Sequence, residues 1–261
     1  MTSWWRGLSP LPTLAAVLVI AITCALGNWQ LDRAHQKTAR AERLHRLAAM
    51  PPLDLAAVPP AMRGEELVDR PVQAHGRFDS RHVVLLENRP HGDGRDTRSG
   101  FLVLTPLWLD GQRDAGDASG QRSAVLVLRG WLPRDPVDRT RIAPFTTPDD
   151  IVSVHGVALG SVPRVYSLGD AGDEAGQTIR QNLDLQRYAA ETGLPLLPIV
   201  LRQHGGSADG LARDWPAADL GAERHYGYAF QWFGLASLTL VLLLGLSWRR
   251  ARRMRAPQRS A

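Results

Sequence analysis

Two long apolar stretches, one near each end of the chain, dominate the pattern of hydrophobic and polar residues. The first runs from Gly7 to Leu31 and the second from Tyr226 to Trp248, and neither contains a charged side chain. A bilayer core about 30 Å thick needs roughly 20 helical residues to cross it. Both stretches are long enough and nothing between them is, so the sequence predicts a membrane hairpin carrying one large extramembrane insert.

The insert alternates short β-type runs with turn-rich separators, and two helical segments accompany them. One helix continues from the first span to Ala49, where Pro51-Pro52 stops it, and a short one covers Leu185 to Thr192 with Gly193 as its cap. The expected strands are Pro71 to Phe78, His82 to Glu87, Phe101 to Leu109, Ala124 to Trp131, Ile151 to Leu159, Thr178 to Asp184 and Leu196 to Leu201.

This pattern predicts a two-helix transmembrane hairpin plus an α+β extramembrane domain. The domain is expected to be mainly antiparallel β, an open barrel or a sandwich, with one or two helices. The expected segments are a cytoplasmic N-terminus 1–7, a transmembrane helix 8–29, a juxtamembrane helix and linker 30–60, a periplasmic β-rich domain 61–201, a flexible return 202–225, a transmembrane helix 226–248 and a basic cytoplasmic tail 249–261.

The orientation of the hairpin is inferred from charge. A basic tail without acidic residues follows the second span, and its arginines are Arg249, Arg250, Arg252, Arg253, Arg255 and Arg259. A second basic group follows the first span, but Asp32 and Glu42 dilute it, and long inserts translocate largely regardless of charge. We therefore expect a multi-pass protein of the inner (plasma) membrane with both termini cytoplasmic. The alternative for the first span is a removable signal peptide.

Composition excludes several classes of protein. A single cysteine, Cys24, rules out an internal disulfide framework and any zinc site built on paired cysteines. Lys37 is the only lysine, so the basic balance reflects arginine usage and predicts no nucleic-acid binding. The basic tail is expected to contact membrane lipid. The chain lacks a nucleophile elbow, a zinc-protease histidine pair and a phosphate loop, which predicts that it is not an enzyme.

One histidine lies where an apolar span meets water. On a helix that begins near His225, Tyr228 and Trp232 follow at i+3 and i+7 and share its face. An imidazole, a phenol and an indole on one stripe have the chemistry to hold a flat macrocycle, with the imidazole ligating haem iron. The alternative is an ordinary interfacial aromatic belt with one hydrated histidine.

A tryptophan-glutamine pair marks the same lip of each span. Trp29-Gln30 ends the first span and Gln231-Trp232 follows the start of the second. A hydrogen bond between the two amides would contribute on the order of 1 kcal/mol and fix the helix register. Gly27 and Gly234 lie near the same depth and would allow close approach. The alternative is that both amides face lipid headgroups.

Several short blocks give the chain a family resemblance that covers nearly its whole length. It resembles the surfeit-locus (Surf-one) assembly factors for haem-copper oxidases in the segments Gly27 to Arg33 and His225 to Phe233. Between these two signatures, further blocks occur in the family's order: Gly76-Arg77-Phe78, Glu87-Asn88-Arg89, Leu104-Thr105-Pro106 and Arg129 to Arg134.

The resemblance implies a membrane protein that assists maturation of cytochrome c oxidase and is not an enzyme. It implies haem a as the cofactor, with His225 as the candidate iron ligand and Tyr228, Trp232 and Trp29 lining the site. The implied partners are oxidase subunit I and the haem a delivery machinery. Two alternatives stay open: a scaffold that holds oxidase intermediates without binding haem, and a membrane-anchored periplasmic enzyme.

Overall fold

The computed structural model describes residues 9–58, 64–92, 94–110, 122–135, 137–138, 141–165, 176–206, 208–215 and 221–254. The chain divides into two compact units. One contains the two terminal helices and the other contains the β-domain. The polar loops expected near 111–121 and 166–175, and the tail beyond 254, lie outside the described residues.

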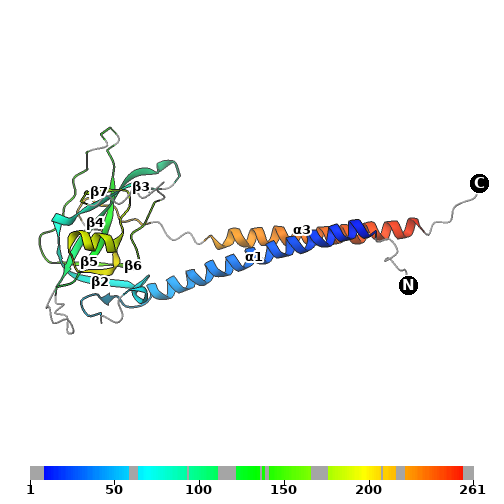
Figure 1. The fold of residues 1–261 in the computed structure, drawn as a ribbon, viewed down its shortest axis with the longest axis horizontal. Coiled ribbons are helices and arrows are strands. Elements are labelled where there is room, and N and C mark those ends of the chain that lie inside the picture. Colours follow the sequence, from blue (N-terminus) through cyan, green and yellow to red (C-terminus); the bar gives the residue numbers. More distant parts are fainter. Residues whose placement is uncertain are drawn as a thin grey trace, which may run out of the picture. The chain divides into compact units, whose positions relative to one another are not determined.

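The first unit is a pair of long helices, α1 (Pro10–Ala48) and α3 (Ala222–Arg253), which run side by side in opposite directions (Figure 1). Their buried and half-buried positions recur at alternating intervals of three and four residues. This spacing averages 3.5 residues and forms the apolar seam of a coiled coil. The seam residues are Thr13, Ala16, Ile20, Thr23, Gly27, Gln30 and Ala34 on α1, and Ala222, His225, Ala229, Trp232, Ala236, Thr239 and Leu243 on α3.

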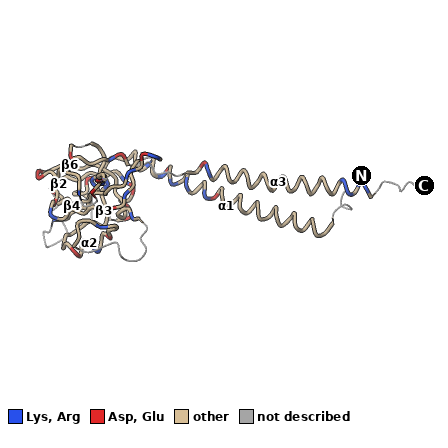
Figure 2. Tube along the Cα trace, turned by 90° about the horizontal axis from the view of Figure 1, so that it is seen from above, with Lys and Arg blue, Asp and Glu red and all other residues tan. Residues whose placement is uncertain are grey.

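Away from the seam, both helices expose large apolar side chains. Leu14, Leu18 and Ile22 on α1 are more than half exposed, as are Val241 and Leu246 on α3. Figure 2 shows the uncharged stretches of the two helices and the basic residues at the C-terminal end of α3. Both helices are long and apolar enough to cross a membrane. Exposed leucine and valine on this scale require an apolar surrounding, which indicates a membrane protein.

The second unit is a closed five-stranded barrel, formed by β2 (Pro71–Phe78), β6 (Val152–Leu159), β8 (Leu196–Gln203), β5 (Ala124–Pro133) and β4 (Arg98–Leu109). All neighbouring pairs are antiparallel except β5 and β8. Pairing of β2 with β4, from Gly76↔Leu109 to Phe78↔Leu107, closes the ring. Gly76 permits this closure because a Cβ there would overlap the carbonyl oxygen of Trp108.

Shorter elements extend the ring. The strand β3 (Val84–His91) pairs with β4, and the two-residue strands β1 (Leu53–Asp54) and β7 (Ile179–Arg180) pair in parallel with β2 and β3. The helix α2 (Leu185–Thr192) ends at Gly193, which adopts a positive φ of 68°. Single 3-10 turns are η3 (Glu65–Leu67), η4 (Ser80–His82) and η5 (Gly94–Asp96).

The barrel interior holds the inward-facing residues of all five strands, and a second cluster fills the space under α2. Val72, Leu107, Val127 and Ile199 are among the fully buried residues of the interior. Tyr188 of α2 packs into the second cluster, with side chains of β3, β4 and β5. The expected mainly antiparallel domain with few helices is confirmed. The sequence predicted an open barrel or a sandwich, and the structure shows a closed five-stranded barrel.

The return segment 202–225 was expected to be flexible, but its residues 209–212 pack against the barrel. Asp209 and Leu211 are both 7% exposed, and Ala212 forms an isolated bridge with Trp131. The sequence is rich in Gly, Ala and Asp here, which is typical of a flexible segment. Composition alone does not show that Asp209 pairs with the buried Arg129. The second helix also begins at Ala222, ahead of the apolar span itself.

Candidate functional site

His225 lies in the first turn of α3, at a seam position that faces α1. Its Nδ1 is 2.7 Å from Oε1 of Gln30, which occupies the opposing seam position. The two residues are 195 positions apart in the sequence, and only the antiparallel pairing of the terminal helices brings them together. Both side chains are partly buried. The contact therefore joins the two helices at the lip of the apolar spans.

The hydrogen bond determines which imidazole nitrogen is available. The amide oxygen of Gln30 is an acceptor, so Nδ1 carries the proton and donates it. In neutral histidine the other nitrogen, Nε2, then keeps its lone pair. This nitrogen has no hydrogen-bond partner among the residues that the structure describes. An imidazole oriented through one nitrogen and open at the other is the usual arrangement of a metal-ligating histidine.

The aromatic residues expected to accompany His225 are placed differently from one another. Trp232, one heptad further along α3, lies half-buried in the seam. Tyr228 and Trp29 are each 51% exposed and flank the seam on its outer sides. The Arg33 guanidinium lies 5.9 Å from the centroid of the Trp29 ring. The structure thus brings His225 and Trp232 into one seam, with Tyr228 and Trp29 on the adjoining surfaces.

A second histidine contact joins the helices at the same lip. The ring of His35 on α1 meets the ring of Tyr226 on α3 edge to face, with 6.2 Å between centroids. His35 follows Gln30 along α1, and Tyr226 follows His225 directly. Two imidazoles, one amide and one phenol therefore gather where the helices enter the apolar span.

The residues expected to pair the helices separate into two groups. Gly27 is buried, and a Cβ at this position would lie 2.8 Å from the Phe233 ring, so its lack of a side chain is what allows the close approach. Gly234 has open space around it, and Gln231 is exposed. Residues 231 and 234 lie between the seam positions 229, 232 and 236, so they face away from α1. Gln30 accordingly pairs with His225, in place of the expected Gln231.

The lip offers one oriented imidazole that could serve as a single metal ligand. Among the described residues there is no group of three or more His, Cys, Asp or Glu side chains that could hold a bare metal ion. Haem iron needs only one or two axial ligands from the protein, because the porphyrin supplies the rest. One oriented imidazole beside aromatic rings and an apolar span matches that requirement.

The barrel contains polar clusters that sequence reasoning missed. Arg129 is 1% exposed; its guanidinium donates to Asp209 Oδ2 at 3.0 Å and to the Thr147 hydroxyl at 2.7 Å. Arg213 pairs with the same carboxylate. Burial lowers the pKa of Arg129, and the Asp209 carboxylate opposes this effect. Arg129 belongs to one of the family blocks, but Asp209 lies 80 residues away in the sequence, so no local motif indicated that the two residues meet.

Asp79 forms a second cluster, at the edge of the barrel. Burial acts to raise the pKa of its carboxyl, but hydrogen bonds from His82, from Arg81 and from Trp108 outweigh it, and the pKa is lowered. His82 Nδ1 lies 2.9 Å from Asp79 Oδ2. The Tyr188 hydroxyl donates to the backbone oxygen of His82, so the cluster connects η4 to α2. The buried carboxylate therefore organises these elements.

From the sequence, Trp131 and Arg134 could contribute to a partner-docking face, although a buried Trp131 that closes the β core is the favoured interpretation. Both side chains are largely engaged within the barrel. Trp131 is 6% exposed and its Nε1 donates to the Arg89 backbone oxygen at 2.9 Å. Arg134 pairs with Glu87 at 2.7 Å. Trp131 closes the β core, which was the favoured sequence interpretation.

Comparison with known proteins gives a consistent match. The family model described as the SURF1 family matches residues 17–237. A "SURF1-like protein" of Rickettsia bellii is 26% identical over 88% of this chain and 88% of its own length. "Surfeit locus protein 1" of Mus musculus is 25% identical over 87% of this chain and 72% of its own length. "Surfeit locus protein 1" of Arabidopsis thaliana is 33% identical over 44% of this chain, which spans 31% of that protein.

Proposed function

Because this chain belongs to the SURF1 family, we propose that it is a membrane-bound assembly factor for a haem-copper (cytochrome c) oxidase. In this role it assists haem a insertion or stabilises subunit I during biogenesis, and its partners are subunit I and the haem a delivery machinery. The observation that carries the proposal is the hydrogen bond from His225 Nδ1 to Gln30 Oε1. It orients an imidazole at the lip of two membrane helices and leaves Nε2 open.

In this proposal, His225 would hold the iron of haem a through Nε2, and Gln30 would keep the imidazole in the required tautomer and orientation. Trp232, Tyr228 and Trp29 offer aromatic surface around the ligand. A single imidazole at the lip would hold the cofactor through one protein ligand. Such a site retains the cofactor and still allows its release, which an assembly factor requires.

The proposed topology places both termini in the cytoplasm and the barrel in the periplasm. Arg249, Arg250, Arg252 and Arg253 lie at the end of α3 beyond the apolar span, and the positive-inside rule favours the cytoplasm for that lip. The His225 lip then faces the periplasm. The protein acts by holding a cofactor or a subunit rather than by catalysing a reaction.

The experiment is to purify the full-length protein in detergent from cells that make haem a and to record visible spectra of the wild type and of His225→Ala. We expect a Soret band in the wild type that is lost or shifted in the variant. The matched control is His45→Ala, which removes an exposed histidine from the same helix pair. It should leave the spectrum unchanged.

The same experiment separates the alternatives. Equal Soret bands in the wild type and in His225→Ala would eliminate His225 as the ligand. Absence of haem from both proteins, with oxidase subunit I still co-purifying, would support the scaffold function. Hydrolase or transferase activity that survives purification and is independent of His225 would support the enzyme alternative.

A further inference from the structure

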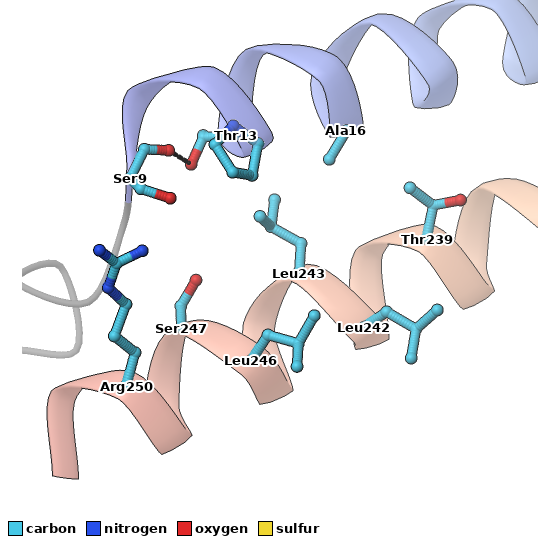
Figure 3. Close-up of a pocket in the computed structure, with 10 residues that line it drawn as sticks. Ser9, Thr13, Ala16, Thr239, Leu242, Leu243, Leu246, Ser247 and Arg250 are labelled. Atoms are coloured by element: carbon cyan, nitrogen blue, oxygen red, sulfur yellow. Dashed lines mark hydrogen bonds between the residues drawn. The ribbon is translucent and has the colours of Figure 1, made fainter. Parts of the chain in front are cut away.

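A groove opens between the first turns of α1 and the last turns of α3, at the end of the helix pair opposite to His225 (Figure 3). Its volume is about 330 Å³, near the lower end of the roughly 300–1,000 Å³ typical of ligand pockets. The groove arises because Thr13 and Ala16, the α1 seam residues here, are too small to fill the space beside Leu243. Figure 3 shows Leu243 pointing toward α1 across this space.

Most of the groove presents only apolar surface. Leu242, Leu243 and Leu246 line its α3 side. The two threonines that border it have satisfied hydroxyls, since Thr13 donates to the Ser9 backbone oxygen at 2.8 Å and Thr239 donates to the Leu235 oxygen at 2.8 Å. Only their methyl groups are therefore available to contact a ligand. An apolar chain would meet no unsatisfied polar group along this part.

One end of the groove is polar and basic. Ser9, Ser247 and Arg250 line it, and Figure 3 shows the Arg250 side chain reaching from α3 toward Ser9. Ser247 is 5% exposed. The neighbouring Arg252 forms a cation–π contact instead, with its guanidinium 3.7 Å from the centroid of the Trp248 ring. Arg250 is thus the arginine that faces the groove.

Among the described residues of α1 and α3, no side chain supplies a counter-charge at this end. The first acidic residue of the chain is Asp32 and the last is Glu223. Antiparallel pairing of α1 and α3 places both of these at the opposite end of the helix pair (Figure 1). Along α1 and α3 near the groove, the described residues include several arginines and no carboxylate. The described part of the helix pair therefore offers these arginines no carboxylate, and a bound anion would find them available.

We propose that this groove is a binding site for one phospholipid with an anionic headgroup. One acyl chain lies between Ala16 and the three leucines, and the phosphate lies at Arg250 with the hydroxyls of Ser9 and Ser247. The observed order of surfaces, apolar and then polar and cationic toward the helix ends, is the order of groups in such a lipid. The groove opens within the apolar spans, where lipid is the surrounding solvent, and anionic headgroups are attracted to arginine clusters.

The test uses native mass spectrometry of the full-length protein in detergent, titrated with phosphatidylglycerol or with phosphatidylcholine of the same acyl chains. We expect one phosphatidylglycerol to bind in preference to phosphatidylcholine. Arg250→Gln should weaken phosphatidylglycerol binding roughly fivefold or more, as expected for loss of one close arginine. Arg249→Gln, an adjacent exposed arginine that does not line the groove, should change it less than twofold.

A second pair of variants tests the apolar part. Ala16→Leu places a larger side chain in the groove and should lower the affinity for both lipids at least tenfold. Ala15 faces outward, so Ala15→Leu should leave the affinity unchanged. Circular dichroism of each variant confirms that the helices are intact.

Three outcomes would overturn the proposal. Equal losses in Arg250→Gln and Arg249→Gln would show only general attraction of anionic lipid to the basic end. Equal affinity of the wild type for both lipids would show that Arg250 does not recognise an anionic headgroup. A dimer without lipid, disrupted by Ala16→Leu, would show that a second copy of this chain fills the groove.

Discussion

A single hydrogen bond, to Gln30, determines which nitrogen of the His225 imidazole carries the proton. The imidazole would be an unremarkable interfacial histidine if Gln30 did not fix its protonated nitrogen. The sequence located both residues at the same lip but assigned Gln30 to a different partner. Amide side chains at membrane lips have many potential partners, and the choice depends on helix rotation, which the local sequence does not specify.

Replacing Gln30 by leucine tests this dependence. Gln30→Leu removes the acceptor for Nδ1, so the imidazole loses its preferred tautomer and orientation, and haem affinity should fall roughly 10–100-fold, as for other residues that orient metal ligands. The measurement is the rate of haem loss to an excess of scavenging globin. Gln231→Leu is the control because Gln231 is exposed. An equal effect in both variants would show that Gln30 does not position His225.

The carboxylate of Asp79 makes part of the barrel's stability dependent on pH. Its pKa is lowered in the folded state, so its contribution is present in full above the unfolded value of about 3.9 and is lost as the pH falls through the folded value. Asp79→Asn should destabilise the barrel by roughly 1.5–3 kcal/mol at neutral pH, because it loses hydrogen bonds to a charged group. The difference from wild type should shrink at acidic pH.

Acid unfolding followed by tryptophan fluorescence checks this expectation. Asp150→Asn, which neutralises an exposed carboxylate of the same domain, is the matched control and should change stability little. A difference between Asp79→Asn and wild type that stays constant between pH 7 and pH 3 would assign the effect to packing rather than to charge.

At the scale of elements, the two terminal helices depend on small residues at their seam. Gly27 lies against the Phe233 ring, which a Cβ at this position would meet at 2.8 Å. In a membrane, helix association relies on van der Waals packing and hydrogen bonds rather than on burial from water, so contact distance matters directly. Gly27→Ala should weaken the pairing by roughly 1–3 kcal/mol through overpacking.

Unfolding in SDS measures this effect. Gly234→Ala is the control, since a Cβ there meets nothing within 4 Å, and it should be neutral or slightly stabilising. The double variant Gly27→Ala, Phe233→Leu should recover part of the loss if the two residues are coupled. Additive effects would show that Gly27 and Phe233 are not coupled.

At the scale of the whole molecule, the proposed topology has one membrane crossing at each end of the chain, and this determines on which side the other parts lie. The proposed topology predicts that a thiol on the barrel is labelled from the periplasm and a thiol after α3 is not. The chain has one native cysteine, so Cys24→Ser provides a clean background. Ala190→Cys on α2 and Met254→Cys at the end of α3 are both at exposed positions.

Labelling of intact cells with a membrane-impermeant maleimide is the measurement. Ala190→Cys should react in intact cells, and Met254→Cys should react only after permeabilisation. The reverse pattern would place the barrel in the cytoplasm. Labelling at both positions in intact cells would show a single crossing in the mature protein.

The sequence by itself determined the two spans, the mainly β character of the insert and the position of most of its strands. These follow from local patterns: uncharged runs long enough to cross a bilayer, alternating apolar residues, and glycine and proline at turns. The strand Pro71–Phe78 and the helix Leu185–Thr192 were predicted to the residue. The notable exception is Thr178 to Asp184, where only Ile179–Arg180 forms a strand.

Only the tertiary structure decided which distant residues meet. Closure of the barrel depends on the pairing of β2 with β4, the buried arginine of β5 is neutralised by Asp209, and Gln30 faces His225. Each of these contacts joins positions far apart in the chain, and its energy depends on the relative rotation and register of two elements. Local sequence does not specify this rotation and register. The sequence therefore identified the chemical groups, and the tertiary structure determined which of them are partners.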